Sequence, residues 1–156
     1  MNEDFLDALR ALLAADARFL VVGAHALAVH GVPRSTGDLD IWIDRSPDNV
    51  ARVWTALLDF GAPLDNRSLA RSDLERHDLV VQIGLPPRRI DLLTGLSGVD
   101  FDHAWLGRIP VMVGNLEVPF LGRASLITNK RATGRLKDLA DLEALGEPPR
   151  EDQPDS

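Results

Sequence analysis

Two aspartates, Asp38 and Asp40, lie two residues apart in a segment that could support metal-assisted chemistry. From residue 38 to residue 44, polar or aromatic side chains alternate with aliphatic ones, which predicts a β-strand with Asp38 and Asp40 on one face. Two neighbouring carboxylates repel each other unless a cation neutralises them. Magnesium suits such a pair because it prefers oxygen ligands and keeps positions open for water and phosphate. The alternative interpretation is a solvated strand face.

A third aspartate, Asp91, lies inside another apolar run, residues 90–93. An acid with aliphatic neighbours on both sides faces either a partner group or solvent, where Arg88 and Arg89 could accompany it. If its strand lies beside residues 38–44, the three acids could hold two metal ions about 3.5–4 Å apart. That geometry clamps the attacking and leaving oxygens of a phosphoryl displacement.

A glycine turn, Gly23-Ala24, lies between a predicted strand and a short predicted helix, upstream of Asp38. Such a turn lets backbone N–H groups approach a phosphate closely. Arg34 and Thr36 come just before the acids. These two residues either stabilise the loop or contact a phosphate or substrate.

A framework of helices and strands must position these residues. Apolar periodicity together with cap and glycine signals predicts helices over residues 4–15, 24–30, 46–61 and 124–145. Short apolar or alternating runs predict strands over residues 18–23, 38–44, 79–84, 89–94, 110–113 and 116–120, the last two forming a hairpin. The polar segment 66–76 shows no periodicity that assigns it. The pattern predicts one α/β or α+β domain, residues 1–146, with a mixed β-sheet flanked by helices, followed by a disordered tail, residues 147–156.

The composition narrows the class of protein. A chain of 156 residues fits one domain that needs neither a disulfide nor a structural metal to fold. The absence of cysteine excludes a disulfide framework, a thiolate zinc site and a thiol nucleophile, and it fits a reducing compartment. A net charge of −7 argues against a general nucleic-acid coat protein. Because no apolar run is long enough to span a bilayer and the first residues do not resemble a signal peptide, we expect a cytoplasmic protein.

Together these motifs resemble the minimal nucleotidyltransferase (polymerase-β-like) superfamily, and in particular small bacterial AbiEii-type proteins, some of which are toxins of toxin–antitoxin systems. The superfamily pattern of strand, glycine turn, Asp-x-Asp and a later Asp is matched by Val22-Gly23-Ala24, Asp38-Leu39-Asp40 and Asp91. The small bacterial branch adds a signature that is matched by His30-Gly31, Arg34, Thr36, Asp38 and Asp40. It also tends to end in a helical motif, matched here by Lys130, Gly134-Arg135, Lys137-Asp138 and Asp141-Leu142. The resemblance extends from about residue 19 to residue 145.

The resemblance implies a nucleotidyltransferase fold and a role for each matching residue. Asp38 and Asp40 would bind two Mg²⁺ ions, or Mn²⁺ in their place, while Asp91 would bind one of them and help to activate the acceptor. The Gly23-Ala24 turn would approach the nucleotide phosphates, and Lys130 would balance the triphosphate charge. The superfamily often has Ser or Gly where this chain has Ala24, so this position brings no hydroxyl to a phosphate.

The resulting hypothesis is magnesium-dependent transfer of a nucleoside monophosphate from an NTP to an acceptor hydroxyl, with release of pyrophosphate. The resemblance implies an RNA or tRNA end, or a hydroxyl of a protein, as acceptor, and a possible antitoxin partner. One alternative is a catalytically degenerate module that keeps the fold and binds without turnover, which Ala24 favours. Another is a toxin–antitoxin component that acts mainly through protein–protein contact.

A basic cluster on the last predicted helix leaves two interpretations open. Its members are Lys130, Arg131, Arg135 and Lys137. On one continuous helix, residues 131, 135 and 138 would share a face. The cluster is then either an exposed face paired with nearby acids or a binding surface for a triphosphate or an RNA backbone.

Overall fold

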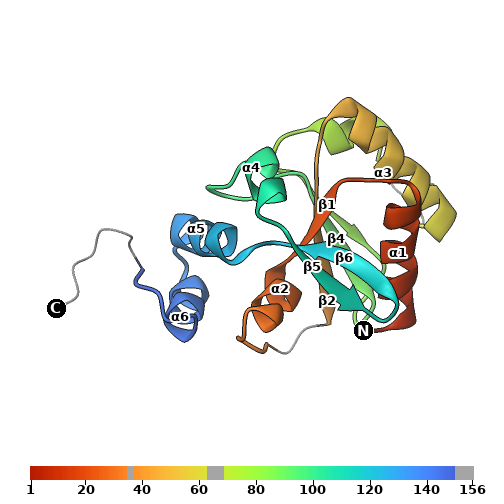
Figure 1. Cartoon of the computed structure of the whole chain (residues 1–156). Helices are drawn as coiled ribbons and strands as arrows, with labels where there is room; N and C mark the ends of the chain where they lie inside the picture. Colours follow the sequence, from red (N-terminus) through yellow and green to blue (C-terminus); the bar gives the residue numbers. More distant parts are fainter. Residues whose placement is uncertain (35–36, 63–68, 150–156) are drawn as a thin grey trace.

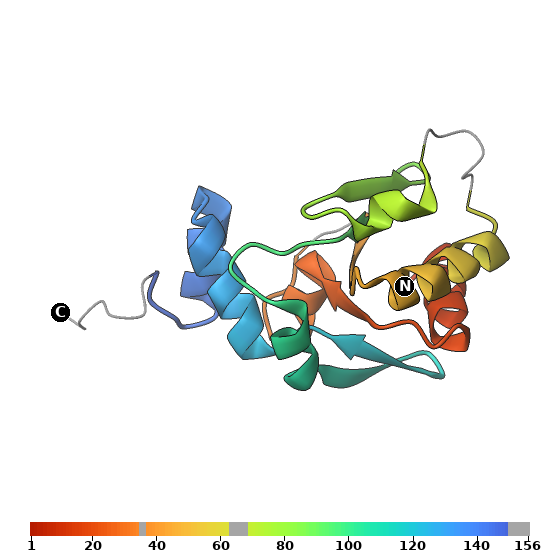
Figure 2. The same ribbon diagram turned by 90° about the horizontal axis from the view of Figure 1, so that it is seen from above.

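The computed structural model describes residues 1–34, 37–62 and 69–149. These residues form a six-stranded mixed sheet in the order β3-β4-β2-β1-β6-β5, with helices packed around it (Figure 1, Figure 2). The strands are β1 Phe19–Val22, β2 Asp38–Ile43, β3 Val80–Ile83, β4 Arg89–Leu93, β5 Ile109–Val113 and β6 Leu116–Phe120. The helices are α1 Glu3–Ala14, α2 Gly23–Val29, α3 Pro47–Phe60, α4 Phe101–Leu106, α5 Arg123–Thr133 and α6 Leu136–Ala144, together with the 3₁₀ helix η2 Arg71–Glu75. The predicted α/β class with a mixed sheet is confirmed.

The centre of the sheet is formed by β1 and β2, which pair antiparallel. On its other side β2 pairs parallel with β4, and β1 pairs parallel with β6. All four residues of β1 are buried, because this strand has a neighbour on each edge. A strand in this position is a continuous apolar run rather than an alternating one, which is the pattern of residues 19–22.

The two faces of β2 have different surroundings. Ile41 packs in an apolar cluster with Leu12 of α1 and Leu57 of α3, and these two helices pack against each other. The opposite face carries Asp40, which lines a pocket together with residues of α5. The predicted alternation of β2 therefore separates a buried aliphatic face from a face that is available for chemistry.

Helix α3 begins and ends where its sequence signals predict. Pro47 occupies the first turn, where its missing N–H leaves no helical hydrogen bond unmade. Gly61 follows the last helical residue with φ of 83°, a left-handed conformation that glycine adopts without strain. Each of the six predicted strands is likewise present within one residue of its predicted bounds.

The prediction of one continuous helix over residues 124–145 is wrong. The chain forms two helices, α5 and α6, because Gly134 adopts φ of 60° and its N–H bonds to Lys130 O, which ends α5. Arg135 has extended backbone, and its N–H donates to Asp138 Oδ2 at 3.1 Å, which caps the start of α6. Residues 131, 135 and 138 therefore do not share one helix face. Two local signals in the sequence indicate this break: Gly134, a residue type that adopts the left-handed conformation, and Asp138, an acid that can cap the start of a helix.

Two elements were not predicted. The 3₁₀ helix η2 lies in the polar segment that showed no periodicity, and it buries Leu74. Helix α4 has six residues, too few to show a clear period, and it begins where the Asp100 side chain accepts a hydrogen bond from His103 N at 3.1 Å.

The beginning of the predicted tail contacts α5. Arg131 Nε donates to Pro148 O at 3.1 Å, and Arg123 Nη2 lies 3.1 Å from Glu147 Oε1. The rest of the predicted tail, residues 150–156, lies outside the described residues. No helix in the described part of the chain is long and apolar enough to cross a membrane.

Candidate active site

The site is built around two carboxylates on neighbouring strands. Asp40 and Asp91 are register partners in the parallel pair β2 and β4, so their side chains project from the same face of the sheet. Burial, the Asp91 carboxylate and the Asp38 carboxylate together raise the pKa of Asp40 to about 6, and hydrogen bonding with Asp91 adds to this rise. The condition that the sequence left open, that the strand of Asp91 lies beside that of Asp40, is met.

Arg89 offsets part of this negative charge, and the sequence reasoning did not include it in the site. Its Nη2 atom lies 2.6 Å from Asp38 Oδ2, and its Nε atom lies 3.1 Å from Asp91 Oδ1 without the alignment of a hydrogen bond. Arg89 precedes Asp91 by two residues on β4, so the period of a strand places both on one face. That spacing is the signal that could have identified it.

Gly23 lets the backbone at the start of α2 approach Asp40 closely. It has φ of 69°, and a Cβ atom at this position would collide with Asp40 Oδ2. Val22 at the end of β1 is the register partner of Asp40, which explains why the turn and the carboxylate meet. The glycine turn and the Asp-x-Asp strand therefore lie side by side in the structure.

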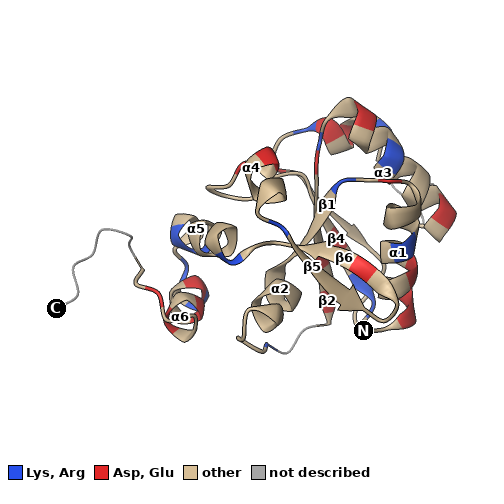
Figure 3. Ribbon diagram, in the orientation of Figure 1, with Lys and Arg blue, Asp and Glu red and all other residues tan. Residues whose placement is uncertain are grey.

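A pocket of about 510 Å³ opens beside Asp40. Its walls bring together the predicted residues Gly23, Ala24, Arg34, Asp40 and Lys130. Asp38 and Asp91 do not line it. Asp91 is the cross-strand neighbour of Asp40, and Arg89 joins Asp91 to Asp38. The last predicted site residue, Thr36, lies outside the described residues. The wall formed by α5 and α6 adds Asn129, Arg135, Lys137 and Asp141, so its cations outnumber its one lining acid, and Figure 3 shows basic and acidic residues side by side on this pair of helices.

The basic wall is fixed by a buried ion-pair network. Lys130, which is 8% exposed, places Nζ 3.2 Å from Asp138 Oδ1 and 3.1 Å from Asp141 Oδ2. Arg34 Nη2 lies 2.6 Å from Asp141 Oδ1. The network therefore joins α5 and α6 to the segment that leads into β2.

Asp138 is the fully buried member of this network, and its surroundings keep it charged. Arg135 Nε donates to Asp138 Oδ2 at 2.7 Å. Burial acts to raise the pKa of Asp138, but hydrogen bonds from Arg135 and Lys130 outweigh it and hold this pKa well below its ordinary value. Three cations, Arg34, Lys130 and Arg135, thus share two carboxylates, which leaves the wall positive.

The carboxylates provide the oxygen donors that Mg²⁺ prefers, and Asp91 Oδ1 is a buried oxygen without a hydrogen-bond partner. The crowding that raises the pKa of Asp40 is the electrostatic situation that a cation relieves. In the described part of the chain, no three acidic or histidine side chains are already arranged around one metal position. Instead Asp38 faces Arg89, so the donors fit magnesium in type while the guanidinium carries part of the compensating charge.

The histidines in and just after α2 have packing contacts. The ring of His25 packs edge-on against Phe5 at 6.1 Å, and burial lowers its pKa. His30 Nε2 lies 2.8 Å from Leu121 O at the end of α2. Trp42 is 2% exposed and packs against Phe101 at 5.0 Å.

Among the comparisons with known proteins, the one with solved structures supports the fold. No family model matches the sequence, and no curated protein matches it. A solved structure from Thermotoga maritima, described as a "putative nucleotidyltransferase", matches over 94% of this chain and 92% of that chain with a TM-score of 0.55 and 15% identity. The likeness shows that this chain has the expected nucleotidyltransferase fold. The narrower resemblance to AbiEii-type proteins stays an expectation.

Proposed function

We propose that this protein is a nucleotidyltransferase that moves a nucleoside monophosphate from an NTP to an acceptor hydroxyl. The observation that carries the proposal is the pairing of Asp40 with Asp91 across β2 and β4, beside a pocket with a basic wall. The fold shared with the Thermotoga maritima protein supports the same class of reaction. An RNA end, a tRNA end and a protein all carry a hydroxyl that suits it.

In this reaction the acceptor oxygen forms a bond to the α-phosphorus of the NTP. The bond from that phosphorus to the oxygen bridging to the β-phosphate breaks, and pyrophosphate leaves with its electron pair. The acceptor hydroxyl loses its proton, which Asp91 would accept. Magnesium ions, held by Asp38, Asp40 and Asp91, would supply positive charge at the attacking and leaving oxygens.

The pocket offers phosphate contacts of two kinds. Gly23 and Ala24 line the pocket beside Asp40, where backbone N–H groups at the start of α2 would meet phosphate oxygens. Lys137 makes no ion pair with another described residue, so it is the cation that a triphosphate can engage first. Arg34 and Lys130 share Asp141, and phosphate oxygens would compete with that carboxylate for both cations.

Arg89 favours a second candidate, a nucleotidyltransferase-fold module that binds without turnover. Its guanidinium already compensates Asp38 and Asp91, at 2.6 Å and 3.1 Å, and Ala24 brings no hydroxyl to the phosphates. In an active enzyme the Arg89 side chain shares these carboxylates with magnesium. In a degenerate module it replaces the metal.

A label-transfer assay tests the proposal. The protein is incubated with each α-labelled NTP, with Mg²⁺ or Mn²⁺, and with total RNA and cell extract as acceptors. Wild type is compared with Asp40→Asn and with the matched control Asp59→Asn, which changes an exposed residue near the end of α3. We expect wild type and the control to transfer label and Asp40→Asn to be slower by roughly a hundredfold or more.

The outcomes separate the two candidates. The absence of transfer by wild type with every NTP would contradict the enzymatic proposal. If ATP with Mg²⁺ then still raised the melting temperature of wild type but not of Asp40→Asn, the binding module would be favoured.

A further inference from the structure

Asp141 is the carboxylate of the buried network that reaches the pocket beside Asp40. It lines this pocket together with Arg34 and Lys130, whereas the fully buried Asp138 does not. Asp141 Oδ1 accepts hydrogen bonds from Arg34 Nε at 3.1 Å and from Arg34 Nη2 at 2.6 Å. Its other oxygen, Oδ2, lies 3.1 Å from Lys130 Nζ. One carboxylate therefore bridges the two cations, with one oxygen on each.

A phosphate group would make the same contacts with these two cations. Guanidinium and ammonium groups bind phosphate oxygens and carboxylate oxygens at similar distances. The Arg34 side chain is 43% exposed, so a ligand in the pocket can reach it. A phosphate that bound beside Asp141 on the same cations would bring two anions together, which is unfavourable. The Asp141 carboxylate and a phosphate therefore compete for Arg34 and Lys130.

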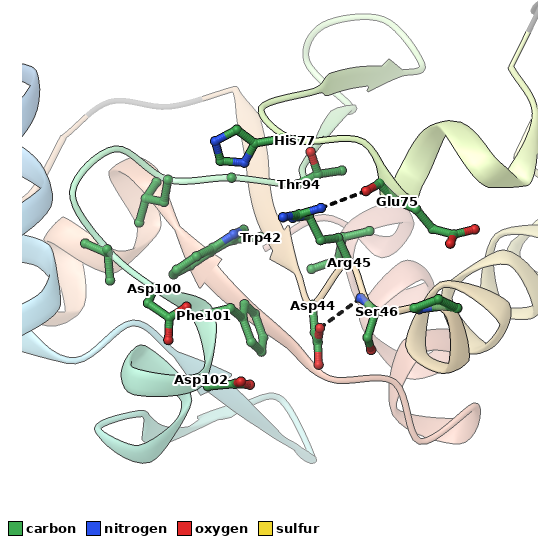
Figure 4. Close-up of a pocket in the computed structure, with 15 residues that line it drawn as sticks. Trp42, Asp44, Arg45, Ser46, Glu75, His77, Thr94, Asp100, Phe101 and Asp102 are labelled. Atoms are coloured by element: carbon green, nitrogen blue, oxygen red, sulfur yellow. Dashed lines mark hydrogen bonds between the residues drawn. The ribbon is translucent and has the colours of Figure 1, made fainter.

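The charge of a neighbouring pocket keeps the phosphates of a nucleotide on the side of Arg34 and Lys130. This second pocket, of about 460 Å³, lies beside Trp42 on the same face of β2 as Asp40, and Leu96 lines both pockets. Figure 4 shows the Arg45 guanidinium inside it, where Nη1 donates to the backbone oxygen of Glu75 at 2.9 Å. Its lining carboxylates are Asp44, Glu75, Asp100 and Asp102. Even with Arg18, which pairs with two of them, the carboxylates outnumber the arginines, so this acidic pocket repels a triphosphate.

The chain has two lysines, and they differ in what a phosphate must displace to reach them. Lys137 lines the pocket and makes no ion pair with another described residue, so a triphosphate engages it without displacing a protein group. Lys130 is 8% exposed and lies between Asp138 and Asp141. A phosphate in the pocket therefore engages Lys130 by taking it from Asp141.

We propose that Asp141 is an internal competitor for the nucleotide phosphates. In the empty protein its carboxylate holds Arg34 and Lys130, and a bound triphosphate replaces it on both cations. The inference rests on the proposed function above and concerns how strongly that site holds its nucleotide. The competition lowers the affinity for the NTP, and it favours release of pyrophosphate because the carboxylate returns to the two cations as the product leaves. Only ion pairs exchange in this step, and no covalent bond changes.

Isothermal titration calorimetry with tripolyphosphate and Mg²⁺ tests the competition. Wild type is compared with Asp141→Asn, which keeps the shape of the side chain, and with Glu143→Gln, which removes one negative charge from an exposed position of α6. We expect Asp141→Asn to bind tripolyphosphate roughly three- to tenfold more tightly, since the ligand no longer displaces a carboxylate. Glu143→Gln should bind within about twofold of wild type, because an exposed charge is screened by solvent. Equal or weaker binding by Asp141→Asn would overturn the proposal.

A second measurement uses the wild-type protein and so does not depend on the folding of Asp141→Asn. Protein labelled with ¹³C at the lysine ε-carbon gives one signal for each of its two lysines, and Lys137→Arg assigns them. Saturating tripolyphosphate should shift both signals, whereas sodium chloride at equal ionic strength should shift neither. A shift of the Lys137 signal alone would mean that Lys130 stays with Asp141, and it would overturn the proposal.

The label-transfer assay separates failure of this inference from failure of the proposed function. If only the Lys137 signal shifts in a protein that transfers label, the competition is overturned and the nucleotidyltransferase proposal stands. If both signals shift and Asp141→Asn binds more tightly, but no label is transferred to any acceptor, the competition stands and the enzymatic proposal is overturned. If tripolyphosphate shifts neither signal, the inference is overturned together with the placement of the phosphates in this pocket.

Discussion

Asp40 and Asp91 lie opposite each other on the adjacent parallel strands β2 and β4, and the Asp91 carboxylate raises the pKa of Asp40. Helix α3, η2 and β3 lie between the two aspartates in the sequence. The aspartates therefore come together only when β4 pairs with β2 in the folded sheet. Two carboxylates at this spacing favour a shared proton or a cation. This relationship underlies the proposed reaction and the first prediction.

In the absence of divalent metal, Asp40→Asn should make the protein more stable at pH 8. The folded-state pKa of Asp40 is about 6, against an ordinary value of 3.8, so between about pH 4 and pH 6 the folded state holds a proton that the unfolded state has lost. Wild-type stability therefore falls as pH rises from about 4 to about 6. The asparagine removes this loss, which is at most about 3 kcal/mol above pH 6.

Urea unfolding of both proteins at pH 4 and pH 8, in buffer with a chelator, measures this difference. Asp59→Asn, at an exposed position, is the control. A variant that is equally stabilised at both pH values would show that the crowding of carboxylates is not the cause.

Gly23→Ala should destabilise the protein and displace Asp40. The new Cβ would collide with Asp40 Oδ2, and φ of 69° is strained for alanine. Gly114→Ala is the matched control, because Gly114 has φ of 61° but open space around its Cβ position. We expect the control to cost about 1 kcal/mol and Gly23→Ala to cost roughly 1–3 kcal/mol more in free energy of unfolding. Equal losses in urea unfolding would mean that the approach to Asp40 is not tight.

Asp138→Asn should break the network that holds α6. The substitution leaves Lys130 with one carboxylate and takes the charged partner from Arg135. Removing one partner of a buried ion pair costs about 3–5 kcal/mol. Glu143→Gln, at an exposed position on α6, should change stability by less than about 0.5 kcal/mol.

The effect of Asp138→Asn should depend on pH in a defined direction. The pKa of Asp138 is lowered in the folded state, so its stabilising contribution is present above its ordinary value of 3.8 and decreases as pH falls below it. Urea unfolding at pH 7 and pH 3 should therefore give a larger difference between variant and wild type at pH 7. A difference that does not change with pH would indicate lost packing rather than lost charge.

Arg89→Gln should make the protein more dependent on magnesium. Without the guanidinium, Asp38 and Asp91 lose their nearest compensating charge, so the melting temperature should fall in a chelator. Added Mg²⁺ should raise it by more than it raises that of wild type, because the guanidinium no longer competes with the ion for these carboxylates.

Arg88→Gln provides the control for Arg89→Gln, since Arg88 is the preceding, exposed arginine and pairs with Asp4 instead. Its melting temperature should respond to Mg²⁺ as that of wild type does. If Mg²⁺ stabilises neither wild type nor Arg89→Gln, the degenerate binding module is favoured over the enzyme.

Much of the framework could be predicted from local sequence signals. The alternation of residues 38–43 defines β2 and puts Asp38 and Asp40 on the face opposite Ile41, and Gly61 ends α3 in the left-handed conformation. The break at Gly134 was missed because the apolar stripe continues across it, although the glycine and the capping acid Asp138 were both present.

What the sequence determined alone is which residues can share a face, because the side-chain period is a property of the local backbone. Only the tertiary structure decided that Asp40 meets Asp91, since strand order and register depend on how the connecting elements cross the sheet and bury their apolar faces. The same holds for Arg34 and Asp141, joined at 2.6 Å from distant parts of the chain. The basic wall and the acidic pocket beside Trp42 likewise arise where helices and loops from both ends of the sequence converge on one face of β2.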